Sequence, residues 1–501
     1  LSGFTLTNGS AQFGGGVLLE TGGVVSNCVL VGNSADFGGG AYFGTLYNYV
    51  FSDYYGLQCD TFFYSALYNC ALINNSASWN GGGAENVTLY DCILAGNTSG
   101  NSGGAACNST LYNCTLTNNL ANMNGGGVYW CTLNNCGLTN NFAGNCGGGA
   151  FNSIVYNCAL INNSAKSYGG GAYFGMLYDC ILTKNSAYCG GGAYSSTNYD
   201  CTFTENSADL GGGAFGCTLY NCKLNYNSAK SYGGGAYLGA LYNCSLNRNS
   251  ANEGGGAYNS TNYNSALTCN SAFNGGGAYL GEFYNCTLTG NSARYDGGGV
   301  YGSKLYNCIV YYNKSPGNPN YYNSILNYSC AAPLPAGEGN ISDEPLLISA
   351  THISASSPCI GKGSSQYASG VDIDGEPWLN PPSMGADEYV LGNVKGPLTV
   401  SIDVNYTNVA TGFAASFVAQ NNGPISASVW NFGDGVVVSN MSYISHSWMA
   451  AGNYTVRLTG YNDSFPSGVS NIVIIKVVNN PIYYVNANSP SPTPPYSSWG
   501  T

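Results

Sequence analysis

Three aspartates occupy equivalent positions in a repeated sequence and are the residues best placed for acid–base or cation chemistry. Asp179 and Asp200 each precede a cysteine by one residue, and Asp91 holds the same place farther upstream. A stacked pair of like charges could raise a pKa or bind a cation. The other acids of residues 1–314 do not converge on one position, and this region contains no histidine. We therefore expect aspartate to replace asparagine at a corner, and we do not expect an enzyme.

Cysteine is the second residue type whose spacing could carry chemistry. Cysteines recur mostly every 21 or 22 residues, and an asparagine follows five residues after each. The central part of this double row consists of Cys92, Cys114, Cys136, Cys158, Cys180, Cys201, Cys222 and Cys244 and of Asn97, Asn119, Asn141, Asn163, Asn185, Asn206, Asn227 and Asn249. The sequence has no Cys-x-x-Cys pair and no cysteine–histidine cluster. We therefore expect structural rows, with no metal and no cofactor.

Both rows belong to one repeat that runs from Gly14 to about Asn313. A typical copy reads Gly-Gly-Gly-Ala-Tyr, then Leu-Tyr-Asn-Cys-x-Leu, then Asn-Ser-Ala. The leucine spacing also fits a leucine-rich repeat, but three consecutive glycines on the return arc would each cost about 1 kcal/mol in a helix. Tight corners between short strands use glycine well. We therefore predict an all-β chain with a parallel β-helix solenoid of about 14 coils, each of 21–22 residues.

One step of the repeat is irregular, because the glycine triplets that begin at Gly38 and Gly81 are 43 residues apart. We interpret this step as two coils with one triplet lost, in which Tyr49 takes the cysteine position. At a rise of about 4.8 Å per coil, the whole stack would be about 65–70 Å long.

Strand alternation places Cys158 and Leu160 on one face of a strand, which we assign to the interior. The tyrosine before Asn-Cys, such as Tyr156, is ambiguous. Strict alternation would place it inside with the cysteine, whereas a corner at Tyr-Asn would place it outside in an aromatic stripe. We favour the corner, because the preceding leucine row, including Leu111, then also points inward.

The cysteines of the row would stack with parallel Cβ atoms, which are farther apart than the roughly 3.8 Å that a disulfide prefers. We therefore expect mostly buried thiols along the row. Cysteines off the row are better candidates for disulfides. The two pairs that we predict are Cys107 with Cys131 and Cys330 with Cys359.

Composition excludes several classes of function. The 501 residues include only 12 Lys and Arg for a net charge of −12, which cannot supply the basic surface of a nucleic-acid binder. No stretch of about 20 uncharged apolar residues occurs, so we predict no transmembrane helix and no membrane insertion. The chain opens within a repeat at Leu1 and stops at Thr501, so we expect it to be a segment of something longer.

The repeats resemble those of bacterial right-handed parallel β-helix surface proteins, including the Gly-Gly-Ala and asparagine-bearing repeats of polymorphic outer-membrane proteins within the pectate-lyase-like superfamily. Ser329–Leu347 and Val371–Tyr389 resemble the closing segment of such proteins. The resemblance implies a right-handed solenoid over residues 1–314 and a closing segment over 315–391. Within that segment, the sequence from Asp372 to Glu376 looks like the start of a calcium loop but lacks the remaining ligands, so we expect a turn.

Residues 392–397 read as a linker, and alternating strands follow. The sequence Trp430-Asn-Phe-Gly-Asp-Gly, followed by Ala-Gly-Asn-Tyr454-Thr-Val, resembles a PKD domain, an immunoglobulin-like β-sandwich, over residues 398–479. Such domains act as spacers or binding modules on secreted and surface proteins. Residues 480–501 resemble the opening segment of another β-helix or a connector between subunits.

These observations favour a structural, non-catalytic rod or filament outside a bacterial cell or on its surface. Its expected partners are copies of itself end to end or further repeats of the same chain, because a bare first coil would present unpaired backbone groups. The alternative is an adhesin or glycan-binding module that uses the tyrosine and asparagine face. A polysaccharide lyase or hydrolase is a weaker alternative. The candidate glycosylation sites are Asn8, Asn86, Asn108, Asn259, Asn340 and Asn453.

Overall fold

The computed structural model describes residues 1–43, 65–390 and 394–479, and every regular element in them is a β-strand. No helix in these ranges is long and apolar enough to cross a membrane. The chain forms two compact units. They are Leu1–Asp343 with Gly361–Ala386, and Glu344–Ile360 with Asp387–Thr501.

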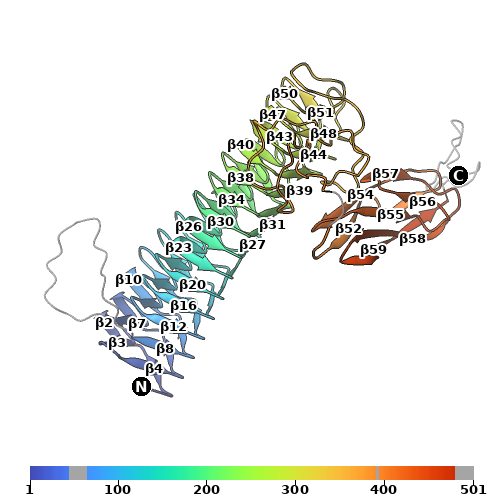
Figure 1. Cartoon of the computed structure of the whole chain (residues 1–501). Coiled ribbons are helices and arrows are strands. Elements are labelled where there is room, and N and C mark those ends of the chain that lie inside the picture. Colours follow the sequence, from blue (N-terminus) through green and yellow to red (C-terminus); the bar gives the residue numbers. More distant parts are fainter. Residues whose placement is uncertain (44–64, 391–393, 480–501) are drawn as a thin grey trace, which may run out of the picture. The chain divides into compact units, whose positions relative to one another are not determined.

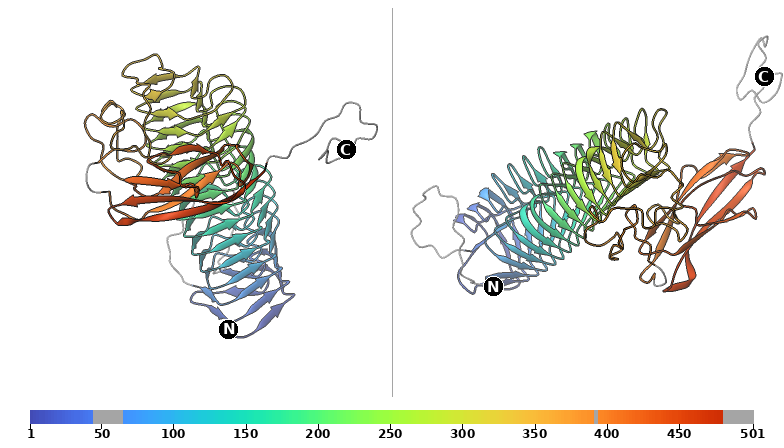
Figure 2. Two further views of the ribbon diagram at one scale, coloured as in Figure 1. Left: turned by 90° about the vertical axis from the view of Figure 1, so that its right-hand side faces the viewer. Right: turned by 45° about the horizontal axis from the view of Figure 1, so that its top comes forward.

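The first unit is a β-solenoid of about 14 turns, in which the coils stack one on another (Figure 1). The strands of successive coils pair in parallel and run in three sheets along the stack (Figure 2). The predicted parallel β-helix is therefore confirmed. We name the three sheets after the residue type that marks them.

The leucine sheet contains the strand that follows each row cysteine. Its 15 strands within the described residues are β1 (Thr5–Thr7), β5 (Val29–Val31), β9 (Ala71–Ile73), β13 (Ile93–Ala95), β17 (Thr115–Thr117), β21 (Gly137–Thr139), β24 (Ala159–Ile161), β27 (Ile181–Thr183), β31 (Thr202–Thr204), β35 (Lys223–Asn225), β39 (Ser245–Asn247), β41 (Ala266–Thr268), β44 (Thr287–Thr289), β48 (Ile309–Tyr311) and β51 (Cys330–Ala331). In most coils, the middle residue of this strand is a buried leucine.

The serine sheet follows the asparagine row. Its strands are β2 (Ser10–Phe13), β6 (Ser34–Phe37), β10 (Ser76–Asn80), β14 (Thr98–Ser99), β18 (Leu120–Ala121), β22 (Phe142–Ala143), β25 (Ser164–Ala165), β28 (Ser186–Cys189), β32 (Ser207–Leu210) and β36 (Ser228–Tyr232). A separate pair continues it, consisting of β42 (Ser271–Ala272) and β45 (Ser292–Ala293). This sheet leads into the glycine corner.

The tyrosine sheet follows the glycine corner and receives two short strands, or one long one, from each coil. Its strands are β3 (Val17–Leu19), β4 (Val24–Ser26), β7 (Ala41–Phe43), β8 (Ala66–Tyr68), β11 (Ala84–Glu85), β12 (Thr88–Tyr90), β15 (Ala106–Cys107), β16 (Thr110–Tyr112), β19 (Val128–Tyr129), β20 (Thr132–Asn134), β23 (Ala150–Tyr156), β26 (Ala172–Tyr178), β29 (Ala193–Tyr194), β30 (Thr197–Tyr199), β33 (Ala214–Phe215), β34 (Thr218–Tyr220), β37 (Ala236–Tyr237), β38 (Ala240–Tyr242), β40 (Ala257–Tyr263), β43 (Ala278–Tyr284), β46 (Val300–Tyr301), β47 (Lys304–Tyr306), β49 (Tyr321–Tyr322) and β50 (Ile325–Asn327). It carries the outward aromatic side chains of the solenoid.

The irregular step of the repeat is one coil, and our interpretation of it as two coils was wrong. Strand β4 pairs directly with β8, β5 with β9, and β7 with β11. The coils on either side are therefore in direct contact, and β7 and β8 belong to a single coil. A spacing of 43 residues fits a lost triplet and an insertion equally well, and only the strand pairing separates them. Tyr49 lies outside the described residues.

Two kinds of corner explain the residue types of the repeat. The residue before each row cysteine has a left-handed backbone, with φ of +54° at Asn113, +52° at Asp91 and +53° at Asp179. Asparagine and aspartate tolerate this conformation better than most residues, so the prediction that aspartate replaces asparagine at a corner is confirmed. At the glycine corner, a Cβ on Gly170 would collide with the carbonyl oxygens of Ser186 and Gly191 of the next coil.

The interior of the solenoid is a single hydrophobic core made of repeated rows. Leu160 is fully buried, and Cys158 is 3% exposed. Tyr156, by contrast, is 38% exposed. Leu111 is also fully buried, so the corner at Tyr-Asn is confirmed and the tyrosines face outward.

Residues 361–386 of the closing segment pack along the last coils of the solenoid. The side chain of Asn264 donates hydrogen bonds to the carbonyl oxygens of Ser369 and Val371 at 3.2 and 2.7 Å. Farther along, a carboxylate oxygen of Asp372 accepts the backbone N–H groups of Asp374 and Glu376 at 3.0 and 2.7 Å. The predicted turn at this position is therefore present.

The second unit is a β-sandwich. One sheet contains β52 (Thr399–Val404), β54 (Ala415–Asn422) and β57 (Tyr443–His446), and the other contains β53 (Asn408–Ala410), β59 (Phe465–Val478), β58 (Gly452–Asn462), β55 (Ala427–Asn431) and β56 (Val437–Ser439). Its core gathers Phe417, Trp430, Phe432 and Trp448. Residues 344–360 join this unit through Ile348, which belongs to the same core.

Candidate functional site

The asparagine row forms a continuous amide ladder inside the solenoid. The side-chain oxygen of Asn141 accepts two hydrogen bonds from Asn119, one from the backbone N–H at 3.0 Å and one from Nδ2 at 2.9 Å. The Nδ2 group of Asn119 also donates to the carbonyl oxygen of Leu94 in the preceding coil at 2.9 Å. Each amide thus satisfies backbone groups that the corner leaves without a strand partner.

The ladder runs unbroken through the described coils. Its members are Asn33, Asn75, Asn97, Asn119, Asn141, Asn163, Asn185, Asn206, Asn227, Asn249, Asn270, Asn291 and Asn313. The side-chain oxygen of Asn320 ends it by accepting the last two bonds, from the backbone N–H and Nδ2 of Asn313. All these side chains are buried, so the row binds coils together and offers nothing to solvent.

The cysteine row is a second buried ladder. The sulfur of Cys136 accepts the backbone N–H of Cys114 at 3.3 Å, and the thiol of Cys114 contacts the carbonyl oxygens of Leu89 and Tyr112 at 3.6 and 3.3 Å. Farther along, the hydrogen bond with Cys201 and burial hold the pKa of Cys180 well above its usual range. The raised pKa keeps the Cys180 thiol protonated.

The two predicted disulfides are not formed, which corrects the sequence analysis. Cys107 is in register with Tyr129, and Cys131 lies two residues farther along, beyond the left-handed Trp130. Cys107 and Cys131 are both free thiols.

The pair of Cys330 and Cys359 is likewise unbonded. Cys359 is a buried free thiol, and the thiol of Cys330 donates a hydrogen bond to the carbonyl oxygen of Asp343 at 3.2 Å. Spacing alone could not exclude these pairs, because it does not show which side chains face each other.

The candidate glycosylation sites differ in what their side chains do. Asn8, Asn108, Asn259 and Asn453 are exposed, and Asn86 is partly exposed. Asn340 is partly exposed, and both ends of its amide bond to the protein. Its Nδ2 group donates to the carbonyl oxygen of Leu326 at 2.8 Å, and its oxygen accepts the backbone N–H of Ser329 at 2.9 Å.

Two aromatic ladders lie on the outside of the tyrosine sheet. The first consists of the tyrosines before Asn-Cys, whose stacked ring centroids are 4.9 to 5.2 Å apart from Tyr156 to Tyr306. The second consists of the aromatic residues after Gly-Gly-Gly-Ala and stacks continuously from Tyr129 to Tyr301. The sequence analysis missed this second ladder, although the recurring Gly-Gly-Gly-Ala-Tyr was a sufficient signal. Together the ladders present rows of ring edges and phenol groups, because the ring faces stack on one another.

The aromatic ladders have breaks near the start of the solenoid. In the second ladder, Glu85 takes the aromatic position and pairs in register with Tyr42 and Cys107. Glu85 is 5% exposed, and one of its carboxylate oxygens has no hydrogen-bond partner. Burial raises the pKa of Glu85 to about 8. A neutral carboxylic acid at this place is the physical consequence.

The aspartates singled out in the sequence serve the outer corner. An oxygen of Asp91 accepts a hydrogen bond from Nδ2 of Asn113 at 3.1 Å, and one of Asp200 accepts from Nδ2 of Asn221 at 3.2 Å. They thus continue an outer amide row rather than face a basic partner. The ion pair of Glu282 with Lys304, at 3.0 Å, is exposed on the tyrosine sheet.

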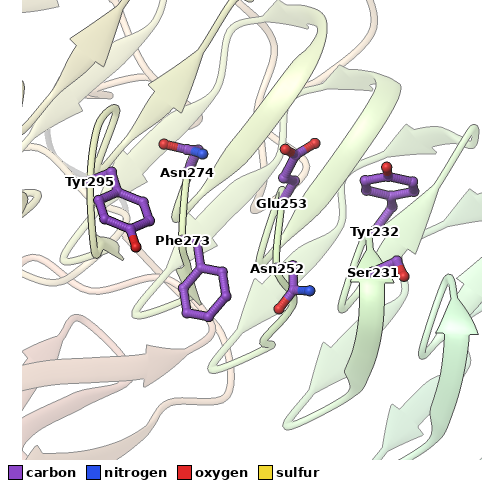
Figure 3. A pocket seen from close by; sticks show the side chains of 7 residues that line it. All are labelled: Ser231, Tyr232, Asn252, Glu253, Phe273, Asn274 and Tyr295. Atoms are coloured by element: carbon purple, nitrogen blue, oxygen red, sulfur yellow. The ribbon is translucent and has the colours of Figure 1, made fainter.

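A cavity of about 270 Å³ opens on the outer surface between the serine sheet and the glycine corner. Figure 3 shows the side chains that line it, which come from successive coils. They are Ser231, Tyr232, Asn252, Glu253, Phe273, Asn274 and Tyr295. The sequence analysis did not find this site, because its residues come from the variable stretch before each glycine triplet.

Comparison with known proteins identifies the second unit. No curated protein matches the chain. Among solved structures, the chain is similar to a mannuronic acid specific polysaccharide family 6 lyase enzyme from human gut microbiota, with 10% identity and a TM-score of 0.21. That match covers 67% of this chain and 78% of that chain, and at this level it carries no argument about activity. Residues 399–475 match the PKD domain family, so the sandwich is a PKD domain.

Proposed function

We propose that this chain is a non-catalytic structural protein, a stiff unit of a rod or filament outside a bacterial cell or on its surface. The observation that carries the proposal is the unbroken amide ladder from Asn33 to Asn320. A ladder that joins each coil to the next resists bending and shear along the whole solenoid, because every coil would have to break buried hydrogen bonds to move. PKD domains are typical of extracellular or surface proteins, which supports the location.

The partners that we propose are copies of the chain, or further repeats of it, joined end to end. Parallel coils pair only with the coil before and after, so a solenoid extends by adding coils at its ends. The low share of charged residues, 7%, also favours contacts between such units over repulsion.

Electron microscopy of the purified full chain tests this proposal. We expect stiff particles that join end to end at high concentration. Isolated particles that cleave a polysaccharide would contradict it.

A second candidate function is the binding of glycans, and the two aromatic ladders favour it. Stacked rings such as Tyr199 and Tyr220, with centroids 4.9 Å apart and ring planes at 8°, offer ring edges for apolar contact with sugars and hydroxyls for hydrogen bonds. A surface rod that carries such ladders would hold on to a glycan over several coils. Replacing Tyr199, Tyr220 and Tyr242 together by serine would remove three neighbouring rings. We expect weaker retention of the chain on a glycan array after this change.

A further inference from the structure

The cavity of the serine sheet combines the two kinds of group that hold a sugar ring. Its aromatic side is formed by Phe273 and Tyr295, which are 41% and 53% exposed, with centroids 6.1 Å apart and ring planes at 56°. The guanidinium of Arg294 lies 5.6 Å from the Phe273 centroid and 5.8 Å from that of Tyr295. Exposed rings tilted in this way form a shallow apolar corner.

The polar side of the cavity is formed by amide and carboxylate groups. Figure 3 shows the Glu253 carboxylate and the Asn274 amide in an upper row of side chains, and Asn252 in a lower row. Within the described residues, these three side chains make no hydrogen bond to the protein. Amides and carboxylates can donate to or accept from the neighbouring hydroxyls of one pyranose ring. The site therefore has free polar groups opposite an apolar corner.

The charge of the site selects among sugars. Glu253 is the one carboxylic acid among the lining residues, and burial raises its pKa. Arg294 lies over the rings and is not among the lining residues. An anionic sugar would place its carboxylate near that of Glu253, in a chain that already carries a net charge of −12.

We propose that this cavity binds a neutral pyranose unit of a polysaccharide. The inference rests on the second candidate function, glycan binding, and gives it a defined site and a class of sugar. The cavity also joins the second aromatic ladder, because the ring of Tyr232 lies 4.7 Å from that of Tyr258 and 6.2 Å from that of Tyr237. A chain of sugars held in the cavity can thus continue onto ladder rings.

Titration calorimetry on the full chain tests the proposal with three neutral hexasaccharides, cellohexaose, mannohexaose and chitohexaose, and with anionic hexagalacturonate. We expect the wild type to bind at least one neutral probe and to bind hexagalacturonate at least tenfold more weakly. Phe273→Ala should weaken neutral binding about tenfold, because it removes one ring face. Tyr188→Ala is the matched control, since Tyr188 holds the same place in an earlier coil, is 55% exposed and does not line the cavity.

The variant Glu253→Gln separates charge from shape. It should keep neutral binding within about threefold and reduce the preference against hexagalacturonate. Equal losses in Phe273→Ala and Tyr188→Ala would overturn the cavity as the site and leave glycan binding by the ladders intact. Absence of binding to every neutral probe would overturn both. Thermal unfolding of each variant, unchanged within a few degrees, shows that the fold is intact, because Phe273 and Tyr188 are exposed and Glu253 is only partly buried.

Discussion

The solenoid and the PKD domain bury their interiors in different ways. In the solenoid, most coils repeat one residue type in each buried row, and the Asn163 side chain bonds to the coils directly before and after it. In the PKD domain, Phe417, Trp430 and Trp448 come from separate segments and meet in one cluster. Damage to a row should therefore stay near the damaged coil, whereas damage to the cluster should reach the whole domain.

The largest effect is expected in the PKD domain. Trp430 is fully buried, and its indole N–H donates to the carbonyl oxygen of Met441 at 2.8 Å. Trp430→Ala should destabilise this domain by about 3–5 kcal/mol and speed hydrogen exchange throughout residues 399–475, while the solenoid peptides keep their protection. Trp79→Ala, at a side chain that is 56% exposed, is the control and should change little. If some strands of the PKD domain lost protection from hydrogen exchange and others kept it, a single cooperative core would be contradicted.

A smaller and local effect is expected in the amide ladder. Asn163→Ala removes the bonds from Nδ2 to Leu138 and Asn185 and leaves two donors of Asn141 without their acceptor. We expect a loss of about 3 kcal/mol, because buried polar groups lose their partners. Asn134→Ala, at an exposed position of β20, should cost less than about 0.5 kcal/mol. Chemical unfolding followed by circular dichroism measures the free energy of unfolding of both variants. Equal losses of this free energy would contradict a stabilising role for the ladder.

The sequence predicted the repeated features well, because they depend on spacing alone. A residue every 21 or 22 positions must stack, and strand alternation then fixes which rows face inward. The features that it missed depend on single coils. The pairing of β5 with β9, the separation of Cys107 from Cys131 and the cavity around Glu253 follow from the insertions and local register of particular coils. The repeat pattern carries no information on these.

Glu85 makes the stability of the solenoid depend on pH, because it is a buried titratable group. Its pKa is raised by burial to about 8 from the usual 4.5, so the native state keeps the proton that the unfolded chain loses. Its contribution to stability is present below about pH 4.5 and is lost as the pH rises towards 8. We expect the wild type to lose about 2 kcal/mol between pH 5 and pH 7 relative to Glu85→Gln. Urea unfolding across this pH range measures the difference. Glu282→Gln, at an exposed acid whose pKa Lys304 lowers, should leave the loss in place.

The smallest effect is a gain. Asn262 is fully buried in β40 of the tyrosine sheet, at an inward position where the neighbouring coils carry Leu241 and Phe283. Its side-chain oxygen has no hydrogen-bond partner. Asn262→Leu should stabilise the solenoid by about 1–2 kcal/mol. Asn198→Leu is the matched comparison and should gain less, because Asn198 already bonds the Ser196 hydroxyl at 2.9 Å. A loss of stability in Asn262→Leu would show that the row needs an amide there.

Hydrogen exchange with mass spectrometry on the full chain carrying Asn163→Ala tests the central claim most directly. If the ladder holds the solenoid together coil by coil, protection should fall most between residues 138 and 185, recover over the next coils in both directions, and stay unchanged in the PKD domain. Uniform loss across all coils, or no loss at all, would contradict a structural rod maintained by its amide row.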